Sequence, residues 1–198
     1  MLLRFFRLIR LKFTTASAIK SVDKCLESNK PLYESAMASG DDELMSVVNI
    51  NIYCLLVEKD LRYALYSLLS NRVNYRKQFY ARSLAVELCE YLKSMSSLLD
   101  SSFWRILEKY VHDRSIIEKF KNKLAIMRTI RGRHGEFLRT IRNVCAAHRD
   151  TDSLKQLEVI ECMNPERVAR IAADVEGVHE AILSIWMDIM PRIIEDRL

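Results

Sequence analysis

Turn-forming residues are scarce in this chain. Only four glycines and three prolines occur among its 198 residues. A sheet-rich protein of this size needs many turns, and turns draw on glycine and proline. The scarcity therefore favours a few long elements. Because no stretch alternates apolar and polar residues for long, we expect these elements to be helices.

Long apolar runs and metal-binding motifs are lacking as well. No run approaches the roughly 18–20 apolar residues that a membrane span needs. The five cysteines are scattered and odd in number, and no group of cysteines and histidines has zinc spacing. Phosphate-binding glycine loops and the Gly-x-Ser-x-Gly motif are also absent. We therefore expect reduced thiols in a cytoplasmic protein, and neither a metal nor another cofactor.

Acidic residues are missing from residues 1–22. That segment holds five of the 31 basic residues, so the rest of the chain balances 26 basic residues against 26 acidic ones. The balance excludes a protein that binds nucleic acid through its bulk charge, and any RNA contact would depend on a local basic patch. We divide the chain into a basic amphipathic segment, residues 1–22, and a single helical domain, residues 23–198.

Residues 1–13 form an amphipathic pattern that has three interpretations. At helical spacing one face collects Leu2, Phe5, Phe6, Ile9 and Phe13, and arginines and a lysine occupy much of the rest. The segment could be the first helix of a bundle, with its aromatic face inward. It could instead lie on an anionic membrane surface or target an organelle. We expect the first interpretation, with membrane contact through residues 1–13 as an alternative.

Apolar residues at helical spacing predict the remaining elements. Breaks are expected at Lys30-Pro31, at residues 39–42 and at residues 71–74. Three helices are predicted between these breaks and the middle of the chain, at about 43–69, at about 75–99 and in a short stretch after Asp100. A long helix follows from about 113 into the 140s, and Gly132 and Gly135 weaken its middle. The last two predicted helices cover 154–163 and the stretch from Asn164-Pro165 to about Pro191. The fold class is therefore all-α, a single antiparallel helical bundle.

One stretch of nine residues combines two chemical abilities. It reads Arg142-Asn143-Val144-Cys145-Ala146-Ala147-His148-Arg149-Asp150. His148 can move protons near neutral pH, and Arg142 can hold a phosphate. Bare Arg-x(4–6)-His spacing carries little information, because two other histidines of the chain also have it. The specific features are Asn143, the two alanines before His148, and the capping cluster and final helix that follow.

With these features the stretch resembles the Arg-x(4–6)-His signature of the HEPN superfamily. HEPN domains are small helical bundles, and many are metal-independent RNases that act as dimers. The resemblance implies Arg142, Asn143 and His148 as catalytic residues and a homodimer that cleaves RNA. We assign Arg133, Arg139 and Arg149 to RNA binding. By analogy it also implies a toxin or antiviral-defence effector, controlled by an antitoxin or another regulatory protein.

The spacing sets a geometric condition. Residues six apart on a straight α-helix differ by about 240° around the axis and about 9 Å along it. Arg142 and His148 would therefore not share one face of such a helix. They can act together only if the helix ends or kinks between them, or if two copies of the motif meet.

A non-catalytic interpretation stays open beside the enzymatic one. Ile141, Val144, Cys145 and His148 form an apolar stripe at helical spacing, so the stretch could be the interface of a helical interaction module. In that case His148 would be buried with a fixed partner and Arg142 would pair with an acid. In an RNase both would line a wet, basic cleft.

Two further basic stretches have the same ambiguity. Residues 128–134 are rich in arginine and could contact an RNA backbone or form a solvated face. Residues 75–82 interleave aromatic and basic side chains. That pattern is typical either of base stacking or of a buried face with a basic rim, and we expect Phe79 to point inward.

Overall fold

The computed structural model describes residues 2–146 and 153–195, and the elements in these two ranges are all helical. None of the described helices is long and apolar enough to cross a membrane. The elements are α1 (Leu2–Ser39), α2 (Asp42–Ser70), α3 (Asn74–Leu98), α4 (Ser101–Tyr110), α5 (Arg114–Ile141), the π-helical turn η1 (Arg142–Ala146), α6 (Ser153–Cys162) and α7 (Pro165–Glu195). The all-α prediction is confirmed.

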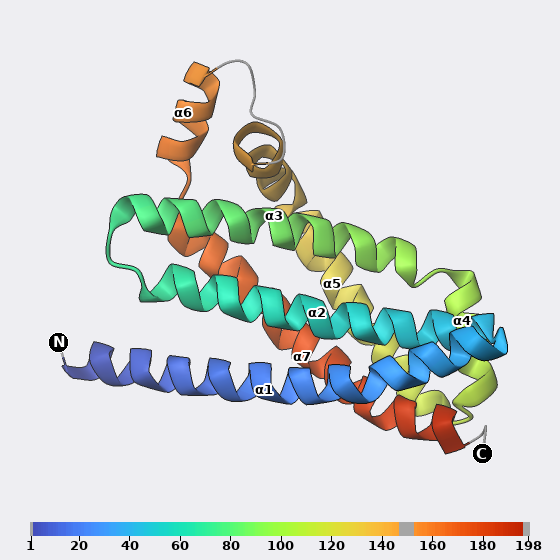
Figure 1. Ribbon diagram of the computed structural model, residues 1–198. Helices are drawn as coiled ribbons and strands as arrows, with labels where there is room; N and C mark the ends of the chain where they lie inside the picture. The colour runs from blue at the N-terminus through green and yellow to red at the C-terminus, as the bar shows by residue number, and fades with distance from the viewer. Residues whose placement is uncertain (1, 147–152, 196–198) are drawn as a thin grey trace.

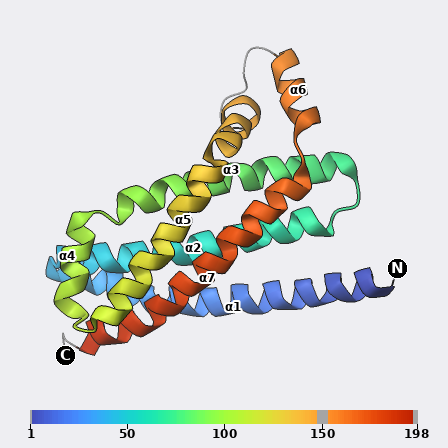
Figure 2. The same cartoon turned by 180° about the vertical axis from the view of Figure 1, so that it is seen from behind.

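Four long helices form the bundle. α2 packs on α3, α3 on α5, α5 on α7, and α7 closes the ring against α2. Figure 1 shows α2 and α3 side by side. Figure 2, which views the molecule from behind, shows α5 and α7 crossing them. α1 packs along the outside of α2, while α6 stands beyond α3 next to η1. The end of α5 thus leaves the bundle where the Arg-His motif begins.

Apolar residues of the four long helices and of α4 form one continuous core. At its α4 end, the rings of Phe103, Phe120 and Trp186 meet edge to face with centroids 5.6–6.1 Å apart. Such pairs stabilise a core beyond the area they bury. This cluster fixes α4, α5 and α7 against one another.

Most helix starts follow the predicted capping residues. The carboxylate of Asp41 accepts a hydrogen bond from the backbone N–H of Leu44, and Asp100 and Asp113 cap α4 and α5 in the same way. Asn164 caps α7, whose first residue is Pro165. These bonds satisfy backbone donors that have no partner within the helix.

The break expected at Lys30-Pro31 is wrong. Pro31 lies inside α1, which also runs without interruption across the boundary drawn between residues 22 and 23. A proline costs a helix one backbone hydrogen bond and a steric clash. α1 packs along α2 on both sides of this position, and these contacts offset that cost.

Two aromatic side chains predicted to face inward are exposed instead. Phe13 is 70% exposed on α1, and Phe79 is 50% exposed on α3. The buried face of α3 includes Leu84 and Leu88. Phe79 lies about 140° from the first and about 180° from the second around the helix, so it points away from the core.

Candidate functional site

The Arg-His motif begins where α5 changes from α-helical to π-helical. η1 spans Arg142–Ala146 and follows α5 directly. A π-helix bonds residue i to residue i+5, and short π-helical turns are frequent at functional sites. The side chains within η1 therefore do not keep α-helical angles to Arg142. A change from regular α-helix is one of the conditions under which the spacing of Arg142 and His148 allows the two residues to act together.

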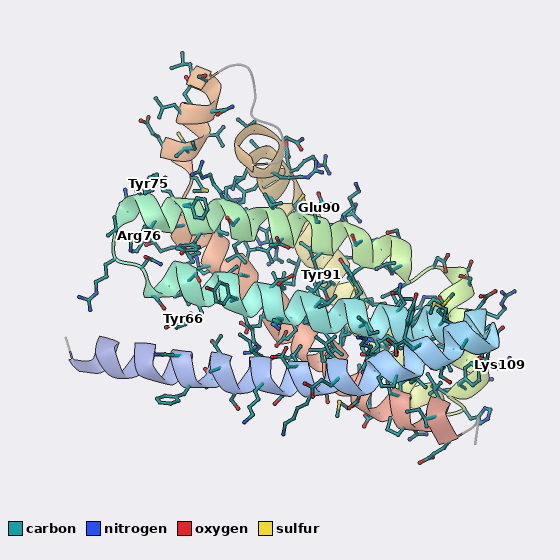
Figure 3. All side chains as sticks on the ribbon, viewed as in Figure 1. Tyr66, Tyr75, Arg76, Glu90, Tyr91 and Lys109 are labelled. Atoms are coloured by element: carbon teal, nitrogen blue, oxygen red, sulfur yellow. The ribbon has the colours of Figure 1, made fainter. Side chains whose placement is uncertain are left out.

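Arg142 is half-buried between η1 and α3. Its Nε lies 2.5 Å from Oε1 of Glu90, and its Nη1 donates a 3.0 Å hydrogen bond to Oδ1 of Asn143. Glu90 is labelled on α3 in Figure 3, on the side of the end of α5. Arg142 thus has an acidic partner, as the non-catalytic interpretation expects. Asn143 orients Arg142 through its oxygen.

His148 and Arg149 lie outside the described residues. The structure therefore leaves the predicted role of His148 and the RNA contact of Arg149 as predictions. It does place Ile141 and Val144 in the core, with 1% and 7% of their surface exposed. This buried pair anchors η1 against the bundle on the side away from solvent.

Basic side chains gather along the seam between α3 and α5. Arg139 lies three residues before Arg142, and residues at this spacing are neighbours on a helix. A small hollow of about 50 Å³ in the seam is lined by Arg139, Lys93 and Arg131, and Nη1 of Arg131 donates to Oγ of Ser96 at 2.8 Å. We call Lys93, Arg131, Arg139 and Arg142 the α3–α5 basic cluster. Such a cluster can bind phosphate groups of a nucleic-acid backbone.

The charges of several basic side chains reach Cys89, a half-buried residue of α3 in this seam. Burial raises the pKa of the Cys89 thiol, and Glu90 acts in the same direction. Arg142, Arg139 and Lys93 oppose the shift, because their positive charges favour the thiolate. Three cations and one acid therefore act on a single half-buried residue between the two helices.

Arg133, the remaining predicted RNA-binding residue, is not part of this cluster. It precedes Arg142 by nine residues, which places it about 180° away around α5. Its charge, together with that of Arg167, helps to lower the pKa of His134, for which burial is the main cause. Arg133 is exposed and lies on a different face of α5 from Arg142.

A second polar site, which the sequence interpretation missed, lies between α2 and α7. The guanidinium of Arg62 forms ion pairs with Glu58 through Nε, with Glu176 through Nη1 at 3.0 Å, and with Glu180 through Nη2. Burial raises the pKa of Glu58 and of Glu176, while Arg62 lowers both. Three carboxylates share one guanidinium here, so the site carries excess negative charge when all are ionised.

His179 is buried beside this cluster and is neutral. Its ring is 0% exposed, and burial lowers its pKa to about 4. In the neutral ring Nε2–H donates to the carbonyl oxygen of Cys54 at 3.0 Å, and Nδ1 accepts from the hydroxyl of Tyr91 at 2.5 Å. His179 therefore ties α7 to α2 and α3 through the core.

The sequence contained a signal for this site. His179 lies four residues after Val175 and three before Ile182, both core residues, so helical spacing already placed it on the buried face of α7. Glu58 and Arg62 are four apart, as are Glu176 and Glu180, so each pair lies on one face. What the sequence could not show was that the two faces meet.

The carboxylates of Glu58, Glu176 and Glu180 form a candidate metal site. Their oxygens lie within 4.8 Å of one another, which is close enough for a cation. Arg62 already contacts all three of them, so a metal ion would have to displace a guanidinium that fits the space. The residues present therefore fit an organic cation, the side chain of Arg62, and do not fit a metal ion.

Comparisons of the chain with protein-family models, with curated proteins and with solved structures gave no match. The resemblance to HEPN proteins therefore rests on the residues of the motif alone.

Proposed function

We propose that the protein is a HEPN-type RNA endonuclease that acts without a metal as a homodimer, with a HEPN-like arrangement of its bundle. The observation that carries the proposal is the π-helical turn at Arg142. It changes the direction of the side chains within the motif, at the start of the Arg…His interval and beside the α3–α5 basic cluster. The spacing allows Arg142 and His148 to act together where the helix departs from a straight course or where two copies of the motif meet, and the turn and the homodimer correspond to these two conditions.

The chemistry needs few groups. RNA carries its own nucleophile, the 2′-hydroxyl, which attacks the adjacent phosphorus once its proton is removed. The bond from phosphorus to the 5′-oxygen of the next nucleotide then breaks, and that oxygen takes up a proton. His148 serves as the general base or acid. Arg142 stabilises the charge that develops on the phosphate oxygens, and Arg139 and Lys93 hold the neighbouring backbone. The products carry 2′,3′-cyclic phosphate ends.

A dimer completes this proposed site. Two copies of η1 would meet with both motifs facing one cleft, as in the HEPN proteins that the motif resembles. η1 and α6 stand outside the bundle in Figure 1, so they are placed where a second copy can approach them. A toxin or defence role, with an antitoxin or other regulatory protein as partner, follows by the same analogy.

The test is RNA cleavage by the purified full chain in the presence of EDTA. We expect the wild type to cut RNA and to leave cyclic phosphate ends. His148→Ala and Arg142→Ala should each lower the cleavage rate at least ~100-fold, since each removes a group that acts in the transition state. Lys119→Ala, which removes an exposed cation from the far half of α5, is the matched control and should keep the wild-type rate.

A second candidate is favoured by one observation, the ion pair between Arg142 and Glu90. It is the contact expected of a non-catalytic helical interaction module, in which Arg142 holds η1 on α3. The variant Glu90→Gln separates the two candidates, because it releases Arg142 without removing it.

In an RNase, Glu90→Gln should bind RNA more tightly than the wild type, because the free guanidinium can pair with a phosphate. In an interaction module, Glu90→Gln and Arg142→Ala should weaken self-association by the same factor, and neither protein should bind RNA. RNA affinity from fluorescence anisotropy and self-association from analytical ultracentrifugation distinguish these outcomes.

A further inference from the structure

An elongated cavity of about 570 Å³ lies between α1, α2 and α7, away from the Arg-His motif. On α1 its lining extends from Ala18 to Leu32, a distance of about 21 Å along the helix. Its walls are mainly apolar and include Val22, Leu32, Leu55, Leu183, Met187 and Met190. Elongated apolar cavities with few polar groups are typical of sites for small molecules.

Four polar donors in the wall are already bonded to neighbouring acceptors. Their hydrogen bonds are Ser21 Oγ to the Ser17 carbonyl (3.1 Å), Ser28 Oγ to the Lys24 carbonyl (3.0 Å), Asn29 Nδ2 to the Cys25 carbonyl (2.7 Å) and Asn51 Nδ2 to Asn29 Oδ1 (3.1 Å). These groups therefore make the wall polar in places without requiring a ligand.

Two buried polar atoms of residues in this wall have no hydrogen-bond partner among the described residues, the donor Nε1 of Trp186 and an acceptor of Glu58. Glu58 lines the cavity, is only 3% exposed, and has one oxygen engaged by Arg62. Its other oxygen, Oε2, has no hydrogen-bond partner among the described residues. Nε2 of His179 lies 3.6 Å from Oε2, and that N–H is bonded to the carbonyl of Cys54. A buried acceptor without a donor is costly, so such an atom calls for a partner.

The charges around Glu58 favour a cation as that partner. On α2, Arg62 is shared among three carboxylates, and on α7 these include Glu180, which also lines the cavity. His179 on α7 is neutral near pH 7, and Tyr91 on α3 is neutral as well. The one basic residue that lines the cavity, Lys24 on α1, is exposed at its rim.

We propose that this cavity binds a small amphiphilic amine. The ammonium group donates to Oε2 of Glu58 beside Glu180, and the alkyl chain lies along the apolar groove between α1 and α7. The site is separate from the Arg-His motif, so the proposal holds whether or not the protein cleaves RNA.

Titration calorimetry with three ten-carbon probes tests the proposal on the full chain. Decylammonium should bind at least ~10-fold more tightly than decanol, since only the ammonium can pair with Glu58, and decanoate should bind more weakly than either. Within a series of alkylammonium ions, each added CH₂ should tighten binding about fourfold until the groove is full.

Two matched variants locate the ammonium group. Glu58→Gln should abolish the preference for decylammonium over decanol. Glu176→Gln removes a carboxylate from the same arginine but not from the cavity wall, so it should keep the preference. Ser28→Trp, at an exposed wall position, should block the groove and weaken all three probes.

Equal affinities for decylammonium and decanol, tighter binding of decanoate, or the absence of binding by all probes would overturn the proposal. A preference that survives in Glu58→Gln would also overturn it. Circular dichroism shows whether each variant is folded, and if Glu58→Gln fails to fold, the chain-length series and Ser28→Trp decide.

Discussion

Single residues in the core of this protein hold the bundle together through polar contacts as well as apolar ones. His179 reaches α2 through the carbonyl of Cys54 and α3 through Tyr91. Both ring nitrogens are used, and the bond that Nδ1 accepts from Tyr91 requires the neutral form. Protonation of His179 would therefore break one of its two hydrogen bonds inside the core.

This requirement predicts a loss of stability in acid. The pKa of His179 is about 4 in the folded chain, against 6.5 for the group without perturbation. Between these values the unfolded state binds a proton that the folded state does not, so stability falls as the pH falls from 6.5 towards 4. Between pH 7 and pH 5 this term amounts to about 2 kcal/mol.

Urea unfolding of the wild type and of His179→Gln at pH 7 and at pH 5 measures this loss of stability. The variant should be less stable than the wild type at pH 7 but should lose about 2 kcal/mol less between pH 7 and pH 5. The raised pKa of Glu58 and of Glu176 affects the pH dependence of stability with the opposite sign. Because both carboxylates are present in the wild type and in the variant, comparing these two proteins removes their contribution. The exposed control His112→Gln should keep the wild-type pH dependence. Equal pH dependence in His179→Gln and wild type would contradict the neutral role of His179.

At the scale of helices, the capping residues were predictable from the sequence, but the unbroken course of α1 was not. Asp100 and Asp113 cap helices because their carboxylates reach backbone donors two or three residues away, which is a local property of the sequence. Pro31 was expected to break the chain and lies inside α1. Its effect is outweighed by packing against α2, which comes from residues distant in sequence.

The glycines give a prediction at this same scale. Gly132 lies within α5, and a Cβ there would meet no atom within 4 Å. Gly132→Ala should therefore stabilise the protein by about 0.5–1 kcal/mol, because alanine loses less backbone entropy in a helix. Gly40 has a φ of 68° in the turn between α1 and α2.

Gly40→Ala serves as the contrasting variant and should destabilise the protein, since an L side chain is strained at that φ. Thermal unfolding of the two variants beside the wild type checks both signs. A lower midpoint for Gly132→Ala would show that α5 is not a regular helix at this point.

The candidate site was only partly predictable, because it also depends on packing between residues that are distant in the sequence. The motif residues could be found because they lie together in the sequence. The partner of Arg142, Glu90, comes from α3 and could be found only once α3 and α5 were packed together. The π-helical turn also depends on that packing, because Ile141 and Val144 are buried on either side of its start.

For the whole molecule, the proposed homodimer would form at the end of the bundle that carries η1. The end of α5, η1 and α6 extend past α3, whereas α1 and α4 cover other parts of the bundle (Figures 1 and 2). A homodimer built through this end would bring two basic clusters to one cleft. We expect sedimentation of the wild type to give a dimer whose stability decreases when Val144, which is buried within η1, is changed to aspartate.

The most direct measurement is cleavage of one oligonucleotide in its all-ribose form and its all-deoxyribose form by purified protein in EDTA, followed by mass spectrometry of the ends. We predict that only the ribose form is cut, that the fragments carry 2′,3′-cyclic phosphates, and that His148→Ala cuts neither. An uncut ribose form under conditions where a control RNase cuts it, or unchanged cutting by His148→Ala, would contradict the proposed RNase activity.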